Sequence, residues 1–245
     1  METRLLLLEG RTDVSFFLPL IKELYGFKEA KCEDLPVLEE GPKKKGLSRA
    51  ICLSKDDTRL VVWHANGKDN LKNALKLIFK AIERLEDTPA IIGIARDVDT
   101  EESILNWAKS TLQSGGGFEP DVKDGYLMIN GIKVIPFGIG EVDFDARDID
   151  LKKELELLMA LLAKKESSLS KLEGSISQLR KDLGRKLTPP KDIMHLLAIA
   201  RNYGGDSMSG LYRNFIEKLI RENRELVEEF LNESGLKEFL NAIAR

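Results

Sequence analysis

Three apolar segments in the first 100 residues each run directly into a polar, mostly acidic tip. The segments are Leu5–Leu8, Leu60–Trp63 and Ile91–Ala95, and the tips are residues 9–13, 66–69 and 96–99. Segments this apolar are typical of strands buried on both faces, as in a parallel sheet covered by helices. The carboxyl ends of parallel strands share one edge, where ligands bind. We therefore expect the acidic side chains of the tips to lie together, namely Glu9, Asp13, Asp97 and Asp99.

Helical patterns alternate with these strands, which predicts right-handed βαβ units and an α/β fold with a mostly parallel sheet flanked by helices. The helices are expected over about 13–25, capped by Thr12 or Asp13 and stopped by Gly26, then over 69–85 and 101–112. A loop is expected at 115–117. Asn130-Gly131 predicts a type I′ hairpin turn within 126–137. Residues 27–59 hold short strands and read as an insertion or an extension of the sheet.

The composition changes near residue 150, which predicts an α/β domain over 1–148 followed by an all-helical region over 149–245. Leucine and isoleucine recur at alternating steps of four and three over about 150–184, which predicts a long helix with a coiled-coil-like seam. The seam would form a homodimer or fold back within the chain, and the second arrangement is favoured. Further helices are expected at about 190–202, 210–222, 223–232 and 235–244.

The overall charge and the apolar content limit the class of protein. Net charge is −3, so no global basic field indicates nucleic-acid binding, although a nuclease with bound Mg²⁺ remains compatible. No apolar run reaches membrane-spanning length and no signal peptide is recognised, which predicts a cytoplasmic protein. A charged fraction of 32% leans towards a thermophile. Cys32 and Cys52 lack metal-type spacing, so reduced thiols are expected, with a disulfide left open for a hyperthermophile.

Two aspartates at i and i+2 after a strand, with a glutamate after a neighbouring strand, suit metal-dependent phosphoryl transfer. Asp97 and Asp99 can converge on one ion, and Glu9 can complete a second site or act as a general base. Taken alone, the aspartate pair would more often be a helix cap and a loop residue. The addition of Glu9 favours the metal site. The two histidines, His64 and His195, are expected to be structural.

The segments Leu-Leu-Leu-Glu-Gly-Arg-Thr-Asp at 6–13 and Arg-Asp-Val-Asp at 96–99 resemble a Toprim domain. This module occurs in topoisomerases, bacterial primases, some small nucleases and the OLD family. Ala-Asn-Gly-Lys-Asp-Asn at 65–70 is similar to a segment of the OLD-type branch, and the resemblance covers roughly residues 4–145. OLD proteins carry an ATPase domain ahead of this module. No phosphate-binding Gly-x-x-x-x-Gly-Lys-Ser/Thr loop occurs here, so any ATPase would belong to a separate chain.

The resemblance implies particular roles for residues of this chain. Glu9, Asp97 and Asp99 would hold Mg²⁺ or Mn²⁺, and Asp13 would help with a second ion. Lys68 would neutralise charge on the reacting phosphate. Glu156 would be the acidic residue at the start of the helix after the last strand, with Glu154 close behind.

Two functions follow for such a chain. The first is Mg²⁺- or Mn²⁺-dependent phosphodiester cleavage of DNA or RNA, since no tyrosine is marked as a topoisomerase nucleophile and no primase accessory part is found. The alternative is a non-catalytic module of the same fold that binds nucleic acid, a nucleotide or a partner protein. The acidic set favours the enzyme, whereas the acidic pI favours the module.

Overall fold

The structure is a computed structural model that describes residues 1–32, 50–84, 88–98, 103–141, 154–166, 178, 181–182, 184, 194 and 207–245. The chain divides into two compact units. Unit 1 comprises Met1–Arg96, Glu101–Gly138 and Glu238–Arg245, and unit 2 comprises Asp97–Thr100 and Ile139–Lys237. The sequence placed all of 149–245 in one helical domain, whereas residues 238–245 are grouped here with the sheet of unit 1.

The described residues form one eight-stranded sheet with the order β2-β3-β4-β1-β5-β8-β7-β6. The strands are β1 (Glu2–Leu8), β2 (Lys28–Ala30), β3 (Ile51–Lys55), β4 (Thr58–His64), β5 (Ile91–Asp97), β6 (Asp121–Lys123), β7 (Tyr126–Ile129) and β8 (Ile132–Ile139). Strand β1 runs parallel to both of its neighbours, β4 and β5. The three apolar strands expected from the sequence are therefore confirmed, and they form the centre of the sheet.

The pair β5 and β8 is also parallel. Lys133 N donates to Ala90 O at 3.1 Å and Val98 N donates to Ile139 O at 3.3 Å, so residue numbers rise together along both strands. The margins of the sheet are antiparallel, because β3 pairs with β4, β2 with β3, β7 with β8 and β6 with β7. The sheet is thus mixed, with a parallel centre.

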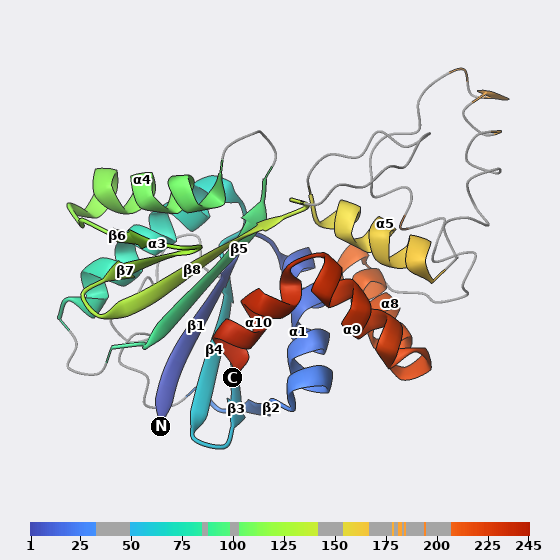
Figure 1. The fold of residues 1–245 in the computed structure, drawn as a ribbon, viewed down its shortest axis with the longest axis horizontal. Coiled ribbons are helices and arrows are strands. Elements are labelled where there is room, and N and C mark those ends of the chain that lie inside the picture. Colours follow the sequence, from blue (N-terminus) through green and yellow to red (C-terminus); the bar gives the residue numbers. More distant parts are fainter. Residues whose placement is uncertain are drawn as a thin grey trace. The chain divides into compact units, whose positions relative to one another are not determined.

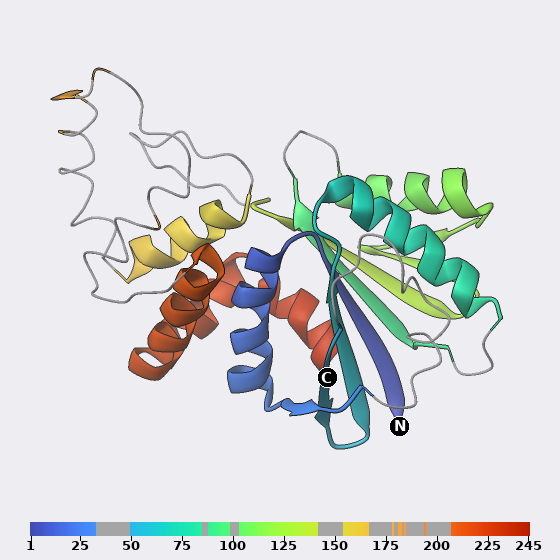
Figure 2. The same ribbon diagram turned by 180° about the vertical axis from the view of Figure 1, so that it is seen from behind.

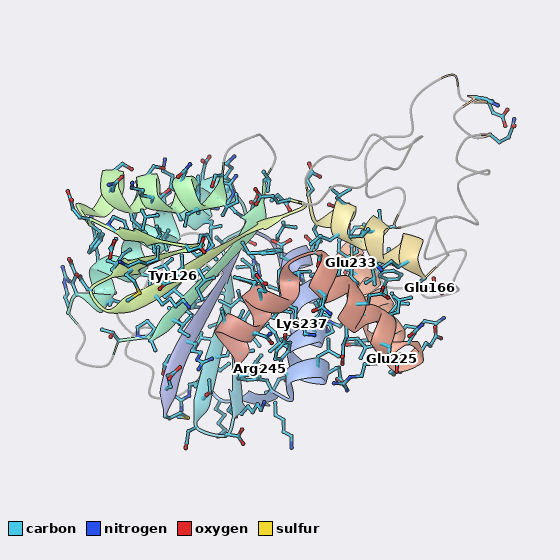
Figure 3. All side chains as sticks on the ribbon, viewed as in Figure 1. Tyr126, Glu166, Glu225, Glu233, Lys237 and Arg245 are labelled. Carbon is cyan, nitrogen blue, oxygen red and sulfur yellow. A yellow bond between two sulfur atoms is a disulfide. The ribbon has the colours of Figure 1, made fainter. Side chains whose placement is uncertain are left out.

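The hairpin between β7 and β8 matches its prediction. Ile129 pairs with Ile132, so only two residues form the loop. These are Asn130 with φ 50° and Gly131 with φ 81°, and positive φ at both central positions is the mark of a type I′ turn. Within this hairpin the Nζ of Lys133 lies 4.4 Å from the ring centroid of Tyr126, which is labelled in Figure 3.

Residues 27–59 extend the sheet at one margin through β2 and β3. A disulfide joins Cys32 to Cys52, with a Cα–Cα distance of 5.3 Å. The expectation of reduced thiols is therefore wrong. The bridge forms because antiparallel pairing of β2 with β3 sets Ala30 opposite Cys52, which brings the end of β2 beside β3. Residues 33–49 of this expected insertion lie outside the described residues.

Two pairs of helices cover the two faces of the unit 1 sheet (Figures 1 and 2). Helix α1 (Arg11–Tyr25) and the part of α10 (Leu236–Ala244) from Glu238 onward share one face. There Phe239 lies 6.1 Å from Phe17 and stacks at 5.0 Å on Phe137, measured between ring centroids. Helices α3 (Lys68–Ile82) and α4 (Ile104–Gly116) pack together on the other face.

Helix boundaries differ from expectation at two places. Gly10, and not Thr12 or Asp13, is the N-cap of α1, and Asp13 lies in the first turn, where its carboxylate accepts a hydrogen bond from Gly10 N. Helix α4 begins after Ser103, whose side chain accepts from Asn106 N, and it continues through Gly116. The expected loop at 115–117 is therefore helical at its first two residues, and Gly117, with φ 69°, ends the helix.

Gly93 in β5 allows the closest approach of a helix to the sheet. A Cβ built at this position would lie 2.7 Å from Ile243 Cγ2 and 3.3 Å from Phe239 Cζ, both on α10. Only glycine lets α10 pack this near to β5, since real Cβ atoms do not approach so closely.

Unit 2 contains α5 (Leu155–Lys165), α8 (Met208–Glu222) and α9 (Arg224–Glu233). The ends of α8 and α9 lie within two residues of the bounds expected from the sequence. Every residue from 155 to 160 is buried, including Leu155 and Leu158 of the expected seam, so burial in this part of the helix is not confined to the seam. Lys165 Nζ forms an ion pair at 2.7 Å with Glu233 of α9, labelled in Figure 3. Most of the expected 150–184 helix beyond α5, and the expected 190–202 helix, lie outside the described residues.

Candidate functional site

Glu9 directly follows the central strand β1 and lies beside a buried arginine. Leu8 pairs with Ala95 of β5, and the next residue of β5 is Arg96. Arg96 Nε lies 3.9 Å from Glu9 Oε2, and the side chains are 1% and 18% exposed. The Arg96 guanidinium also stacks at 4.6 Å over the Trp107 ring of α4. Sequence reasoning missed Arg96, although an arginine inside an apolar strand next to Asp97 was a visible signal.

The connection between β4 and α3 is held against the Glu9 turn by two backbone hydrogen bonds. Ala65 N donates to Leu8 O at 3.0 Å and Gly67 N donates to Glu9 O at 2.9 Å. Asn66 and Gly67 have φ of 56° and 115°, which turns the chain sharply into the helix. Lys68 is the first residue of α3 and is half-buried. The 65–68 segment between β4 and α3 therefore lies next to Glu9.

Asp13 contributes to the cap of α1, but from the first turn of the helix and not as the N-cap residue itself. It is 3% exposed, and its Oδ2 accepts a hydrogen bond of 2.7 Å from Gly10 N. This bond fixes the turn that follows Glu9 and gives a backbone N–H at the start of α1 a hydrogen-bond acceptor. One oxygen of this predicted metal ligand is therefore committed to the fold.

His64 ends β4 at the same edge of the sheet, where it pairs with Leu8. The sequence treated it as a packed core residue, but it is half-buried. Burial lowers the pKa of its imidazole, the charge of Arg11 lowers the pKa further, and a hydrogen bond with Asn66 opposes both effects. Its neutral form is therefore favoured. His64 is a polar group at the candidate site that motif reasoning overlooked.

Asp97 is the last residue of β5 and not, as expected, part of a loop tip. Its Oδ1 accepts a hydrogen bond of 3.0 Å from Leu155 N, the first residue of α5. A carboxylate at a helix N-terminus satisfies an open backbone donor and interacts favourably with the helix dipole. Asp97 thus caps the start of α5. Asp99, the other half of the aspartate pair, lies outside the described residues.

Glu156 lies in the first turn of α5, one residue after the backbone donor that Asp97 binds. The sequence was also compatible with Glu156 being a surface residue of the helix, but its side chain is buried at 6% exposure. Its Oε1 accepts a hydrogen bond from the hydroxyl of Tyr212 in α8. Two of the predicted metal ligands, Asp97 and Glu156, therefore belong to unit 2, while Glu9, Asp13 and Lys68 belong to unit 1.

Within the described part of the chain, no group of three or more histidine, cysteine, aspartate or glutamate side chains is placed to hold a metal ion. The described helices also include none that is long and apolar enough to cross a membrane.

Comparison with known proteins places the chain in a family. A family model described as "Protein of unknown function (DUF3226)" matches residues 3–240. The chain is a DUF3226 protein. This DUF3226 chain is 42% identical over 229 residues to an uncharacterized protein of Methanocaldococcus jannaschii. The matched region covers 91% of this chain and 93% of the relative.

A solved structure is similar over the whole length of this DUF3226 chain. It is the crystal structure of a hypothetical protein from Pyrococcus horikoshii OT3, with a TM-score of 0.89 and 36% sequence identity. The match covers 100% of both chains, and the two proteins share one fold.

Proposed function

We propose that the chain is a Mg²⁺- or Mn²⁺-dependent phosphodiesterase that cleaves nucleic acid, built on a Toprim-type sheet with a helical C-terminal part. One observation carries the proposal. β1 and β5 are adjacent parallel strands in which Leu8 pairs with Ala95, so Glu9, the residue after β1, and Asp97, the last residue of β5, both come at the carboxyl ends of these strands. Acids after neighbouring parallel strands are what the resemblance to Toprim domains implies for metal binding.

The residue types of the proposed donor set suit a hard divalent cation, although the described residues hold no group of three or more such side chains placed around one ion. Glu9 and Asp97 offer carboxylate oxygens, and Asp99, Asp13 and Glu156 are further carboxylates of the proposed set. A bound Mg²⁺ or Mn²⁺ would supply Lewis-acid stabilisation of phosphate charge and a more acidic water. Arg96, at 3.9 Å from Glu9, compensates negative charge around this carboxylate.

The protein groups have separate roles in this proposal. Lys68 begins α3 beside the Glu9 backbone and would stabilise the negative charge that develops on the phosphate. The backbone bonds from Ala65 and Gly67 fix the position of this lysine segment relative to Glu9 before substrate binds. Preorganisation of this kind reduces the reorganisation needed during the reaction.

The test is calorimetric titration of Mn²⁺ and Mg²⁺ into the wild type and into the Asp97→Asn/Asp99→Asn variant. Asp56→Asn/Asp57→Asn is the matched control, since it also removes two charges but from an exposed turn between β3 and β4. We expect metal binding and metal-dependent cleavage of labelled oligonucleotides to be lost in the first variant and kept in the control. Equal cleavage by all three proteins would refute the proposal.

One observation favours the alternative, a non-catalytic module. Asp13 and Asp97 each give an oxygen to a backbone donor at a helix start, at 2.7 Å and 3.0 Å, so the fold itself uses these acids. If that were their whole role, Asp97→Asn would weaken the fold, and the wild type would bind nucleic acid or a nucleotide with no turnover in any divalent metal. The same titrations distinguish the two functions.

A further inference from the structure

Helix α3 carries a ladder of basic side chains that begins at the candidate site. Its members are spaced four residues apart and are Lys68, Lys72, Lys76, Lys80 and Arg84. Arg84 lies two residues after the end of the helix. We call this set the basic ladder. Lys72, Lys80 and Arg84 are exposed, whereas Lys68 and Lys76 are half-buried. The buried face of α3 is formed by other positions, among them Leu71, Leu75 and Ile78.

The charge around the basic ladder is opposite in sign to that of the protein. Residues 68–84 contain five basic side chains against two acidic ones, Asp69 and Glu83, a net charge of +3 in a chain whose net charge is −3. Helix α4, which packs beside α3, has Lys109 as its single charged residue and no acid. Lys72, Lys76 and Lys80 form no ion pair with any described residue. This layer is a local positive surface on an acidic protein.

We propose that the basic ladder binds the phosphate backbone of a nucleic acid and leads it to the edge of the sheet at Glu9. The proposal names the substrate-binding surface of the proposed nuclease and rests on that function for its meaning. The four members within the helix are about 6 Å apart along its axis, so they span about 18 Å. At 3.4 Å per nucleotide of one strand, that length corresponds to about five nucleotides.

The position of Lys68 connects the ladder to the chemistry. Gly67, immediately before it, donates its N–H to Glu9 O at 2.9 Å. A strand lying along α3 would therefore reach the acidic edge at its Lys68 end. The outer face of α3 exposes Leu77 as its one large apolar side chain among the described residues, which does not fit an interfacial membrane helix. Charge complementarity instead fits a polyanion such as DNA.

The experiment measures binding of a fluorescein-labelled 20-base-pair DNA duplex, and of one of its strands, by anisotropy. It is run once with EDTA and once with Ca²⁺. The test variant is Lys72→Gln/Lys76→Gln/Lys80→Gln, which keeps good helix formers and leaves Lys68 untouched. The matched control, Lys28→Gln/Arg213→Gln/Arg221→Gln, removes three exposed charges elsewhere. Thermal midpoints verify that both variants fold.

We expect the test variant to bind DNA at least about tenfold more weakly at about 0.1 M salt. The slope of the logarithm of its binding constant against the logarithm of salt concentration should become shallower by about 2 to 3. The control should stay within about twofold of the wild type. Equal binding by all three proteins, or no binding by the wild type, would overturn the proposal.

Failure of the ladder and failure of the nuclease give different results. If the wild type binds DNA through the basic ladder but cleaves nothing in Mn²⁺, the proposed nuclease activity is refuted and the proposed role of the ladder in binding stands. A test variant that cleaves and binds as the wild type does would refute the ladder and leave the nuclease intact.

Discussion

The hydroxyl of Tyr212 donates a hydrogen bond to the carboxylate of Glu156, and both side chains are buried in unit 2. The bond joins α8 to the first turn of α5, next to the backbone group that Asp97 binds. A buried carboxylate is costly unless it is hydrogen-bonded, so the tyrosine stabilises an acid that the fold would otherwise exclude.

Tyr212→Phe should therefore destabilise the protein by about 1–3 kcal/mol, because it leaves a buried acceptor without this donor while preserving the ring. Denaturant unfolding followed by circular dichroism measures the change. Tyr126→Phe, at a half-buried position of β7, is the control and should alter stability by less than about 0.5 kcal/mol. A Tyr212→Phe midpoint equal to that of the wild type would show that the bond contributes nothing.

Opening the disulfide should lower stability, because the Cys32–Cys52 bridge closes a loop with a sequence separation of 20 residues. Chain-entropy arguments give about 3 kcal/mol for a loop of this size. Cys32→Ser is the preferred variant, since Cys32 is exposed whereas Cys52 is 2% exposed. Dithiothreitol should bring the wild type to the stability of the variant and leave the variant unchanged. A wild type insensitive to reductant would contradict this prediction.

Gly93→Ala should destabilise unit 1 by about 1–3 kcal/mol, because the added methyl would meet Ile243 Cγ2 at 2.7 Å. Ile243→Ala alone should cost about 2–5 kcal/mol through the cavity it leaves. The double variant should be more stable than the sum of the two losses predicts, since the new methyl occupies space that Ile243 vacates. Additive losses in this double-mutant cycle would mean that the two side chains do not compete for space.

The pKa of His64 should be measured below its ordinary value of 6.5 by NMR titration of its ring protons. Because the folded-state pKa is lowered, the folded protein binds fewer protons than the unfolded chain as pH falls below about 6.5, and stability declines there. Arg11→Gln should raise the pKa of His64 by removing a nearby positive charge, whereas Lys28→Gln should not. A value at or above 6.5 in the wild type would contradict this assignment.

The sequence predicted the elements whose signal is local. Leu5–Leu8 and Ile91–Ala95 are apolar on both faces and became adjacent central strands. The Asn130-Gly131 turn was predictable because its positive φ angles select for those residue types. The expected closeness of the 65–70 segment and Glu9 followed from the rule that parallel strands end at one edge, and the Gly67–Glu9 bond realises it.

Features set by distant contacts were not predictable from one sequence. Asp97 resembled a loop ligand, but its carboxylate accepts from Leu155 N, a partner 58 residues away. Cys32 and Cys52 show no motif spacing, and strand pairing alone brings them together. The leucines of α5 fitted a heptad, yet burial of Glu156 and its neighbours follows from packing against more than one helix. In each case tertiary structure outweighed the local pattern.

The return of residues 238–245 to unit 1 has a consequence for how the protein is made. Phe239 and Ile243 lie against Phe17, Phe137 and Gly93, which are all synthesised much earlier. During translation the part of this face around Gly93 and Phe137 stays uncovered until residues 238–245 have been made. An interrupted chain that ends before Phe239 would therefore expose apolar side chains of unit 1 to chaperones and proteases.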